Sequence, residues 1–255
     1  FGPVGAFSYA NASRYERGFD ADGRIVAYRA GTSLRTLTYD AAGRLVAIAD
    51  SAAPSLSATM AYDALDRLTA FEGPLRQAFT YDATGNRTSL TWASTRYDYA
   101  VDPASNRLTA TDGIGGPATP TYDAIGNTLQ SGRYGAAYDA RGRLRRIVAG
   151  AGEVLYVVNA LGQRVRKLGG DPLVPSGTVH FVYDEDGKLL GEYDARGKPM
   201  REIVYLDDLP VAVIAGSGAG EVLNIWPDQL GTPRMVTDQA DRVRWRWDSV
   251  PFGES

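Results

Sequence analysis

Short runs in which apolar and polar residues partly alternate recur along the whole chain. The runs at 76–82 (RQAFTYD) and 152–158 (GEVLYVV) are rich in β-branched and aromatic residues, a composition that favours β-strands. Segment 242–248 (RVRWRWD) alternates most strictly, with Val243, Trp245 and Trp247 on one side and Arg242, Arg244 and Arg246 on the other. We therefore expect strands with one packed face and one solvated face.

Helical patterns are weak, because 29 glycines interrupt nearly every candidate window. Segment 57–71 (SATMAYDALDRLTAF) is the best exception, since its apolar spacing would tolerate a helix. It also carries the motif described next, so we predict a hairpin there. Two segments have the loosest patterns, 111–123 (TDGIGGPATPTYD) and the stretch LGGDPLVPSGT from Leu168, and neither has the composition of a domain linker.

A six-residue motif accounts for the spacing of these runs. It consists of an aromatic residue, Asp, two variable residues, Gly, and then Arg, Asn or Lys, as in YDAAGR from Tyr39. Eleven copies occur, seven with both acid and glycine, and they begin at Phe19, Tyr39, Tyr62, Tyr81, Val101, Tyr122, Tyr138, Val158, Tyr183, Tyr193 and Thr237. Most starts lie 16 to 25 residues apart, which suits two strands and two turns better than two helices.

The motif has the chemistry of a tight turn. Asp is favoured at the first position of a type I turn, and Gly follows where the chain needs a positive φ. This arrangement produces a three-residue hairpin loop with a bulge. The carboxylate can accept hydrogen bonds from the amides of the turn. We therefore predict an all-β fold of consecutive antiparallel hairpins, with the repeated tyrosines packing beside the turns.

Charge and composition exclude several classes of partner. The chain has 255 residues, and its 27 basic and 30 acidic residues give a net charge of −3 without a Lys/Arg-rich run, so neither nucleic acid nor anionic lipid is indicated. The absence of cysteine excludes disulfides and thiolate metal sites. No apolar run approaches the roughly 18 residues of a membrane span. The start lacks both a secretion signal and Met, so we expect a segment of a longer protein.

Several segments resemble catalytic or binding motifs, but each is better explained as part of a strand or a turn. The glycine-rich segment 211–223 has Gly216 and Gly218 but Glu221 at the third position of a dinucleotide-binding fingerprint, and a strand follows it. The acids of YDEDGK, from Tyr183, lack the rest of a calcium loop. Asp207 and Asp208 are adjacent, so on a strand they would face opposite ways.

The remaining candidates are isolated. His180 is the only histidine and has no second imidazole with which to form a metal site or a triad. The glycosylation sequons at Asn11 and Asn86 lie within repeat-type sequence. We therefore assign no catalytic, cofactor-binding or metal-binding residue, and we expect no cofactor and no enzymatic activity.

The repeats resemble those of the YD-repeat, or rearrangement-hotspot (Rhs), proteins. The opening FGPVGAFSYAN is similar to the link between blocks of repeats in that family. Three closing segments resemble the start of the Rhs-associated core, namely YLDDLPVAVI from Tyr205, DQLGTPRMVTD from Asp228 and VRWRWDSVPFG from Val243. The family usually has His where this chain has Gln229. Its core continues to a self-cleavage motif that lies beyond Ser255.

The resemblance implies a fold and a function. Hairpins would spiral into the wall of a hollow shell that encloses a toxic C-terminal domain, as in bacterial polymorphic toxins and insecticidal Tc-toxin C components. It implies a repeat array at 1–206 and the start of the core at 207–255. The expected partners are the protein's own C-terminal toxin domain, the rest of the shell and secretion-system components. The expected location is secreted or on the bacterial surface.

Two alternatives remain open. A secreted or cell-surface YD-repeat module could bind carbohydrate or a partner protein through a tyrosine-rich face. A carbohydrate-active β-solenoid enzyme would need clustered carboxylates outside the turns, and the sequence shows none.

Overall fold

The computed structural model describes residues 2–170, 174, 177–216 and 220–253. Within these residues the regular elements are β-strands, apart from one short 3-10 helix at Pro54–Leu56. The first eleven strands are β1 (Ala6–Ser8), β2 (Arg14–Phe19), β3 (Ile25–Ala30), β4 (Ser33–Tyr39), β5 (Leu45–Asp50), β6 (Ala58–Tyr62), β7 (Leu68–Glu72), β8 (Gln77–Tyr81), β9 (Arg87–Trp92), β10 (Thr95–Val101) and β11 (Leu108–Thr111). The others are β12 (Thr121–Tyr122), β13 (Thr128–Ser131), β14 (Tyr134–Tyr138), β15 (Leu144–Ala149), β16 (Gly152–Val158), β17 (Arg164–Gly169), β18 (Thr178–Tyr183), β19 (Leu189–Tyr193), β20 (Pro199–Leu206), β21 (Leu209–Ala215), β22 (Glu221–Pro227), β23 (Pro233–Thr237) and β24 (Val243–Arg246).

The strands form two sheets in strict chain order. Strands β1 to β11 make one sheet and β12 to β24 make the other, and each strand pairs with its neighbours in sequence. All the pairings are antiparallel, as in β4 with β5 or β8 with β9. The predicted fold of consecutive antiparallel hairpins is therefore confirmed. The segment that would have tolerated a helix, 57–71, forms the β6–β7 hairpin.

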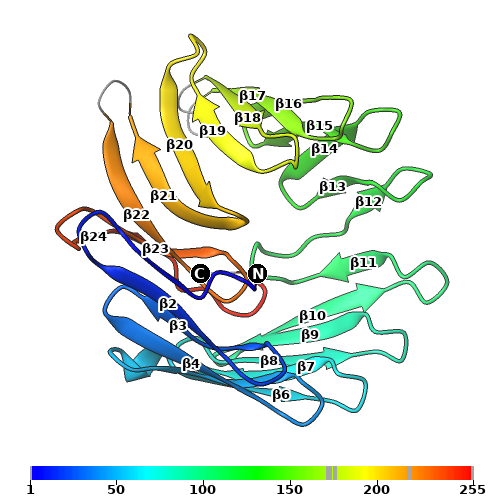
Figure 1. Ribbon diagram of the computed structural model, residues 1–255. Coiled ribbons are helices and arrows are strands. Elements are labelled where there is room, and N and C mark those ends of the chain that lie inside the picture. Colours follow the sequence, from blue (N-terminus) through cyan, green and yellow to red (C-terminus); the bar gives the residue numbers. More distant parts are fainter. Residues whose placement is uncertain (1, 171–173, 175–176, 217–219, 254–255) are drawn as a thin grey trace.

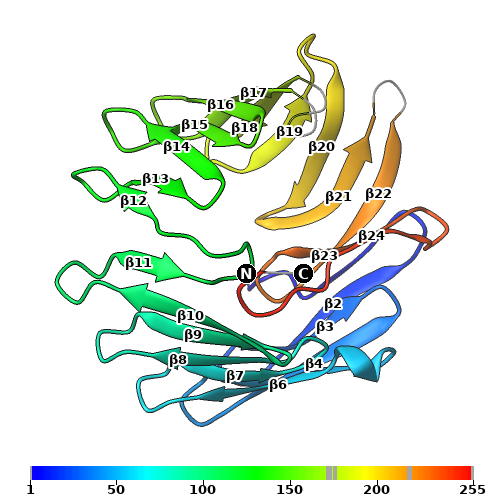
Figure 2. The same ribbon diagram turned by 180° about the vertical axis from the view of Figure 1, so that it is seen from behind.

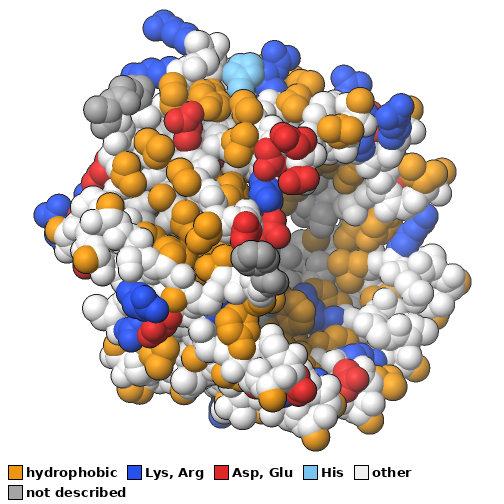
Figure 3. All heavy atoms as spheres, in the orientation of Figure 1, with side chains coloured by type: hydrophobic (Ala, Val, Ile, Leu, Met, Phe, Trp, Pro, Cys, Tyr) orange, Lys and Arg blue, Asp and Glu red, His pale blue; other side chains and the backbone are white. Residues whose placement is uncertain are grey.

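The strands follow a curved path that brings the end of the chain back to its beginning. Figures 1 and 2 show β22, β23 and β24 beside β2 and β3, while β11 and β12 face each other across the break between the sheets. The return contact is a cluster of buried side chains, Tyr9, Tyr15, Leu209, Trp226 and Met235. Figure 3 shows a hollow on the side where β11 and β12 separate, with hydrophobic and acidic side chains around it. The fold is thus a spiralling wall.

One face of the first sheet carries its apolar core. Phe79 lies opposite Leu90 on the neighbouring strand, and both side chains are buried. Leu37, opposite Ile48, is buried on the same face. The other face is formed largely by Thr and Ala side chains such as Thr36, opposite Ala49. Alternation along the strands of this sheet therefore separates a face of large apolar side chains from a face of small side chains.

The expectation for 242–248 is wrong in one respect. Val243 is 54% exposed and Trp245 is 47% exposed, so this apolar side is not packed. The reason is position: β24 pairs with β23 and with no second strand in the described part of the chain. Alternation predicted the strand, but packing of its apolar side requires a neighbour that alternation does not supply.

The two loosest segments lie where the regular pattern is interrupted. Residues 112–120 connect the two sheets. The stretch from Leu168 joins β17 to β18, and its residues 171–173 and 175–176 lie outside the described residues. Val174, within that stretch, is buried against Val154 and Phe181.

Candidate functional site

Most copies of the repeated turn share one geometry, and the turn from Asp102 differs, because the Asp102 N–H donates to the oxygen of Arg107, five residues later. In the turn from Asp40, the N–H of Gly43 donates to the Asp40 main-chain oxygen at 3.0 Å, and the Asp40 N–H donates to the Arg44 oxygen at 3.0 Å. The Asp40 carboxylate accepts from the N–H groups of Ala42 and Arg44 and, at 2.7 Å, from the Arg44 Nε. The side chain thus supplies acceptors for amides that the reversing backbone leaves without ladder partners.

The same two amide bonds to one carboxylate oxygen recur in eight further turns, those of Asp20, Asp63, Asp82, Asp123, Asp139, Asp184, Asp194 and Asp238. The main-chain N–H and guanidinium of Arg143 lower the pKa of Asp139 to about 2. The predicted role of the acid is therefore confirmed. Where glycine is replaced, as by Asp66 or Asp241, the substitute also has a positive φ.

The repeated tyrosines link each hairpin to the one before it. The Tyr62 hydroxyl donates to the main-chain oxygen of Leu45, the residue that follows Arg44 of the preceding turn, at 2.8 Å. The Arg44 guanidinium lies over the same ring, 5.2 Å from its centroid. Equivalent hydroxyl bonds join Tyr39 to Ile25, Tyr81 to Leu68, Tyr122 to Leu108, Tyr138 to Thr128 and Tyr183 to Arg164. Acid, arginine and tyrosine thus form a ladder along the wall, which is interrupted where Val101 and Val158 replace the tyrosine.

Most of the turns share an edge of the wall. Because consecutive strands are antiparallel, every second turn lies at the same edge. Nine of the eleven predicted turns do so, and their hairpin tips point to the right across β6 to β17 in Figure 1. The turns after Tyr193 and Thr237 lie at the opposite edge. Tyr193 accordingly donates to Glu202 at 2.6 Å, and Tyr205 provides the link to Leu189 instead, at 3.2 Å.

One further turn was missed by sequence reasoning. Asp228 accepts from the N–H groups of Leu230 and Thr232, and the Gly231 N–H donates to the Asp228 oxygen at 3.1 Å. The side-chain partner is Arg234, two residues later than usual, at 2.7 Å. The spacing of Asp228 and Gly231 was a usable signal, but Pro227 and Thr232 replace the aromatic and the basic residue of the motif.

A seam closes the curved path between the first and last strands. The Tyr15 hydroxyl donates to the Pro227 oxygen at 3.2 Å, the Tyr9 hydroxyl donates to the Ile225 oxygen, and Arg17 donates to the Asp228 oxygen at 3.1 Å. Burial of Tyr9 raises its pKa. At the opposite edge Ser13 donates to Asp241 at 2.7 Å. Tyrosine hydroxyls near the start of the chain thus donate hydrogen bonds to main-chain oxygens of the last strands.

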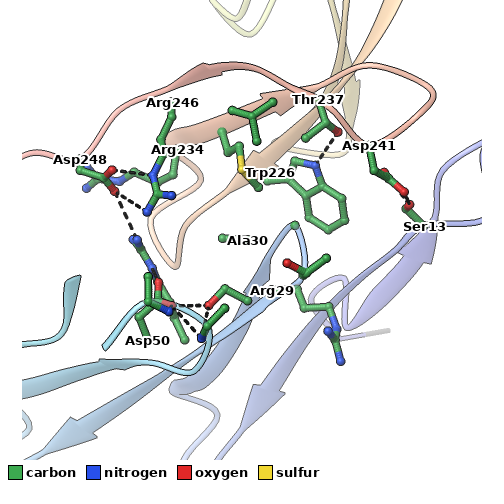
Figure 4. Close-up of a pocket in the computed structure, with 18 of the residues that line it drawn as sticks. Ser13, Arg29, Ala30, Asp50, Trp226, Arg234, Thr237, Asp241, Arg246 and Asp248 are labelled. Atoms are coloured by element: carbon green, nitrogen blue, oxygen red, sulfur yellow. Dashed lines mark hydrogen bonds and ion pairs between the residues drawn. The ribbon is translucent and has the colours of Figure 1, made fainter. Parts of the chain in front are cut away.

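A cavity of about 400 Å³ lies within this seam, between the β3–β4 hairpin and β22 to β24. Figure 4 shows its lining side chains converging from both sides, with Trp226 donating to Thr237 at 3.0 Å. Its labelled arginines are paired with carboxylates, Arg29 with Glu16, Arg234 with Asp228 and Arg246 with Asp248.

The charged network of the seam crosses from one sheet to the other. Arg35 on β4 contacts Asp50 at 2.9 Å and Asp248 at 3.3 Å. Burial opposes ionisation of Asp50, but hydrogen bonds from Ser33 and Arg35 outweigh it and hold its pKa below the usual value. This network joins the first and last strands, and its charges neutralise one another rather than presenting a free charge to the cavity.

The residues considered as site candidates from the sequence lie on different strands and turns of the structure. His180 lies on β18 opposite Arg166 and Tyr193. Asp207 and Asp208 form the tip of the β20–β21 hairpin, where Asp208 contacts Lys188 at 2.9 Å. Gly216 has a positive φ in the β21–β22 connection, and Gly218 lies outside the described residues. Among described residues, no group of three His, Asp or Glu side chains is placed to hold a metal ion.

Three other positions singled out in the sequence are Asn11, Asn86 and Gln229. Asn11 donates to Asp241 at 2.9 Å, and Asn86 donates to Asp82 at 2.9 Å, so both sequons lie in hydrogen-bonded turns. The Gln229 Oε1 is buried without a hydrogen-bond partner. It lies beside a second cavity, of about 390 Å³, which Arg17 also lines. No helix in the described residues is long and apolar enough to cross a membrane.

Comparisons with known proteins agree with this geometry. The Teneurin YD-shell family model matches residues 53–255, and the RHS Repeat model matches residues 19–54. A curated relative, double-stranded DNA deaminase toxin A of Burkholderia cenocepacia (strain H111), is 26% identical over 91% of this chain and 18% of its own length. The crystal structure of TcdB2-TccC3 matches 98% of this chain and 15% of its own, with a TM-score of 0.74 and 14% identity.

The chain therefore belongs to the Teneurin YD-shell family, as the resemblance of its repeats to YD-repeat and Rhs proteins predicted. It spans less than a fifth of the length of either relative.

Proposed function

We propose that this YD-shell segment is a non-catalytic part of the wall of a bacterial toxin, and that the wall encloses a C-terminal toxic domain of the same protein before delivery. The residues 207–255 would begin the Rhs-associated core, after a repeat array at 1–206. The protein would act outside the cell that makes it, secreted or at the cell surface. Its partners would be the enclosed domain, the rest of the shell and components of a secretion system.

This proposal rests on the hydrogen-bond partners of the repeated aspartate and tyrosine side chains. The turn carboxylates accept hydrogen bonds from their own turn, as Asp40 does, and the tyrosine hydroxyls bond the preceding hairpin, as Tyr62 does. These groups hold strands together, so they are not directed toward a substrate. The seam between β2 and β22 further supports a wall that curves back on itself.

The same observation weighs against a carbohydrate-binding face. Tyrosines that bind sugars present a free ring face and a free hydroxyl, whereas Tyr62 has a guanidinium over its ring and its hydroxyl bonded. The relatives provide separate support, because one is named as a DNA deaminase toxin and the other is the TcdB2-TccC3 complex.

Containment can be tested with the complete protein that includes this segment. Brief digestion with a protease should leave the domain after the shell intact, whereas the same domain made alone should be cleaved. A Trp226→Ala variant, which empties the centre of the seam cluster, should expose the enclosed domain. Leu161→Ala is the matched control, since Leu161 is 79% exposed at a hairpin tip. Equal digestion of the domain with and without the shell would rule out containment.

A further inference from the structure

The wall has one place where neighbouring strands do not share a ladder. Among the described strands, each consecutive pair is hydrogen-bonded except β11 and β12. Between these two there is a single antiparallel bridge, in which Thr111 donates to Ala118 at 2.9 Å and Ala118 donates to Thr111 at 2.7 Å. The remaining edge of each strand is unpaired.

The register across this break is the same as elsewhere in the wall. Continuing the pairing from Thr111 and Ala118 places Leu108 opposite Thr121, next to Tyr122. In the intact pair β5–β6, continuing the pairing from Ala47 and Thr59 places Leu45 opposite Ala61, next to Tyr62. The break is therefore a missing part of a ladder, not a change in the path of the wall.

One proline accounts for a missing donor at the break. The next hydrogen-bonded pair after Thr111 and Ala118 would be Thr109 and Pro120, and proline has no N–H to donate. The reciprocal bond, from the Thr109 N–H to the Pro120 oxygen, is also not made. Gly113, Gly115 and Gly116 give the connection further backbone freedom.

Side chains hold the two edges at the other end of the break. The Tyr122 hydroxyl donates to the Leu108 oxygen at 2.8 Å, and the Arg107 guanidinium lies over the Tyr122 ring at 5.5 Å. This is the same link that accompanies a backbone ladder elsewhere, as for Tyr39 and Ile25. Here it spans the break with only the Thr111–Ala118 bridge beside it.

The opposite side of the curved path is held far more firmly. The seam there combines the buried cluster around Trp226 with the Arg35 network and the hydroxyl bonds of Tyr9 and Tyr15. The hollow in Figure 3 opens on the weaker side, between β11 and β12.

We propose that the β11–β12 junction is a hinge at which the wall opens, with Tyr122 as its latch. The two sheets move there as bodies while the seam between β2 and β22 stays closed. In the complete protein this opening would give an extended polypeptide a route through the wall, a consequence that rests on the proposed enclosing function.

Hydrogen exchange at single amides tests the hinge. The amides of Thr111 and Ala118 should exchange at least about tenfold faster than those of Tyr28 and Arg35, a hydrogen-bonded pair of the β3–β4 ladder. The reason is that opening of the junction alone would expose Thr111 and Ala118 to solvent, whereas Tyr28 and Arg35 lie inside a continuous sheet. Tyr122→Phe should accelerate them further. The control is Tyr39→Phe, which removes the same link beside an intact four-pair ladder and should leave the junction unchanged. Pro120→Thr, which restores the N–H, should slow exchange at the junction.

Distance measurements test whether the sheets move. The chain has no cysteine, so spin labels attach only at the introduced Ala64→Cys and Arg141→Cys, at exposed tips of the two sheets, and report the distance between the sheets. Their distance distribution should be broader than that of a control pair within the first sheet, Ala41→Cys and Ala83→Cys. Pro120→Thr should narrow it.

Junction amides that exchange as slowly as those of β3–β4, or a distance distribution between the sheets as narrow as that of the control pair, would overturn the proposal. So would equal effects of Tyr122→Phe and Tyr39→Phe at Thr111. These measurements use the chain itself, so their outcome is independent of whether the wall is found to protect a downstream domain.

Discussion

The hydroxyl of Tyr62 donates to the main-chain oxygen of Leu45, seventeen residues earlier and in the preceding repeat, at 2.8 Å. This bond ties each repeat to its predecessor at the point where a turn becomes a strand. Since a lone hairpin is marginally stable, the wall depends on links of this kind between hairpins.

Removing one such hydroxyl should have a small and measurable cost. Tyr62→Phe leaves the Leu45 oxygen without this partner and should lower the free energy of unfolding by about 0.5–1.5 kcal/mol. Tyr134→Phe is the control, because Tyr134 is 47% exposed and its hydroxyl contacts only its neighbour Arg133 in the described residues. Urea denaturation of the two variants measures the difference. Equal stabilities would show that the hydroxyl bond contributes nothing.

Acid should weaken the wall through its turns. The folded-state pKa of Asp139 is about 2, below the value of 3.8 for a free side chain. The carboxylate's contribution is therefore complete above about pH 4 and is lost as the pH falls through 2. Asp139→Asn should lower the melting temperature at pH 6, and its difference from the unaltered chain should shrink toward pH 2. A difference independent of pH would contradict the role of the ionised form.

Gln77 should be replaceable with a gain in stability. Its side chain is 1% exposed, and neither its Nε2 nor its Oε1 has a hydrogen-bond partner. Gln77→Met keeps the length and removes the unpaired polar atoms, so unfolding should cost about 1–2 kcal/mol more. Gln163→Met should have the opposite sign, because Gln163 Oε1 accepts a hydrogen bond from Asn159 at 2.7 Å. Chemical denaturation checks both, and a destabilised Gln77→Met would refute this account.

The seam should be sensitive to one added methyl group. Gly31 has φ +62°, and a Cβ there would overlap the Met235 Cε across the seam. Gly150 has φ +59° with open space around it, so Gly150→Ala isolates the backbone cost of about 1–2 kcal/mol. Gly31→Ala should cost about 1–3 kcal/mol more than that, through overpacking. Thermal unfolding measures both variants. Similar losses of stability would mean that the Met235 side chain moves aside without a cost in free energy.

Local chemistry explains which parts of this fold were predictable. The bonds of Asp40 lie within five residues of sequence, so the turn and the strands on either side of it follow from the motif. The Asp228 turn was missed because its arginine lies two residues further along. The tyrosines were expected to pack beside the turns, but the acceptor of the Tyr62 hydroxyl was not identified, because the motif does not specify which oxygen of the preceding repeat lies above the ring.

The sequence by itself determined the reversals, the strands and their antiparallel order, because an acid, a glycine and an alternating flank act over a few residues. Only the tertiary structure decided that Tyr193 and Thr237 precede turns at the other edge and that Trp245 is left exposed. It also decided that Tyr15 meets Trp226 across the seam. The edge at which a turn lies depends on how many strands separate it from the previous turn, and the exposure of Trp245 depends on β24 having one neighbouring strand. The contact of Tyr15 with Trp226 depends on how far the sheet curves, a sum of small twists over many strands that no single motif encodes.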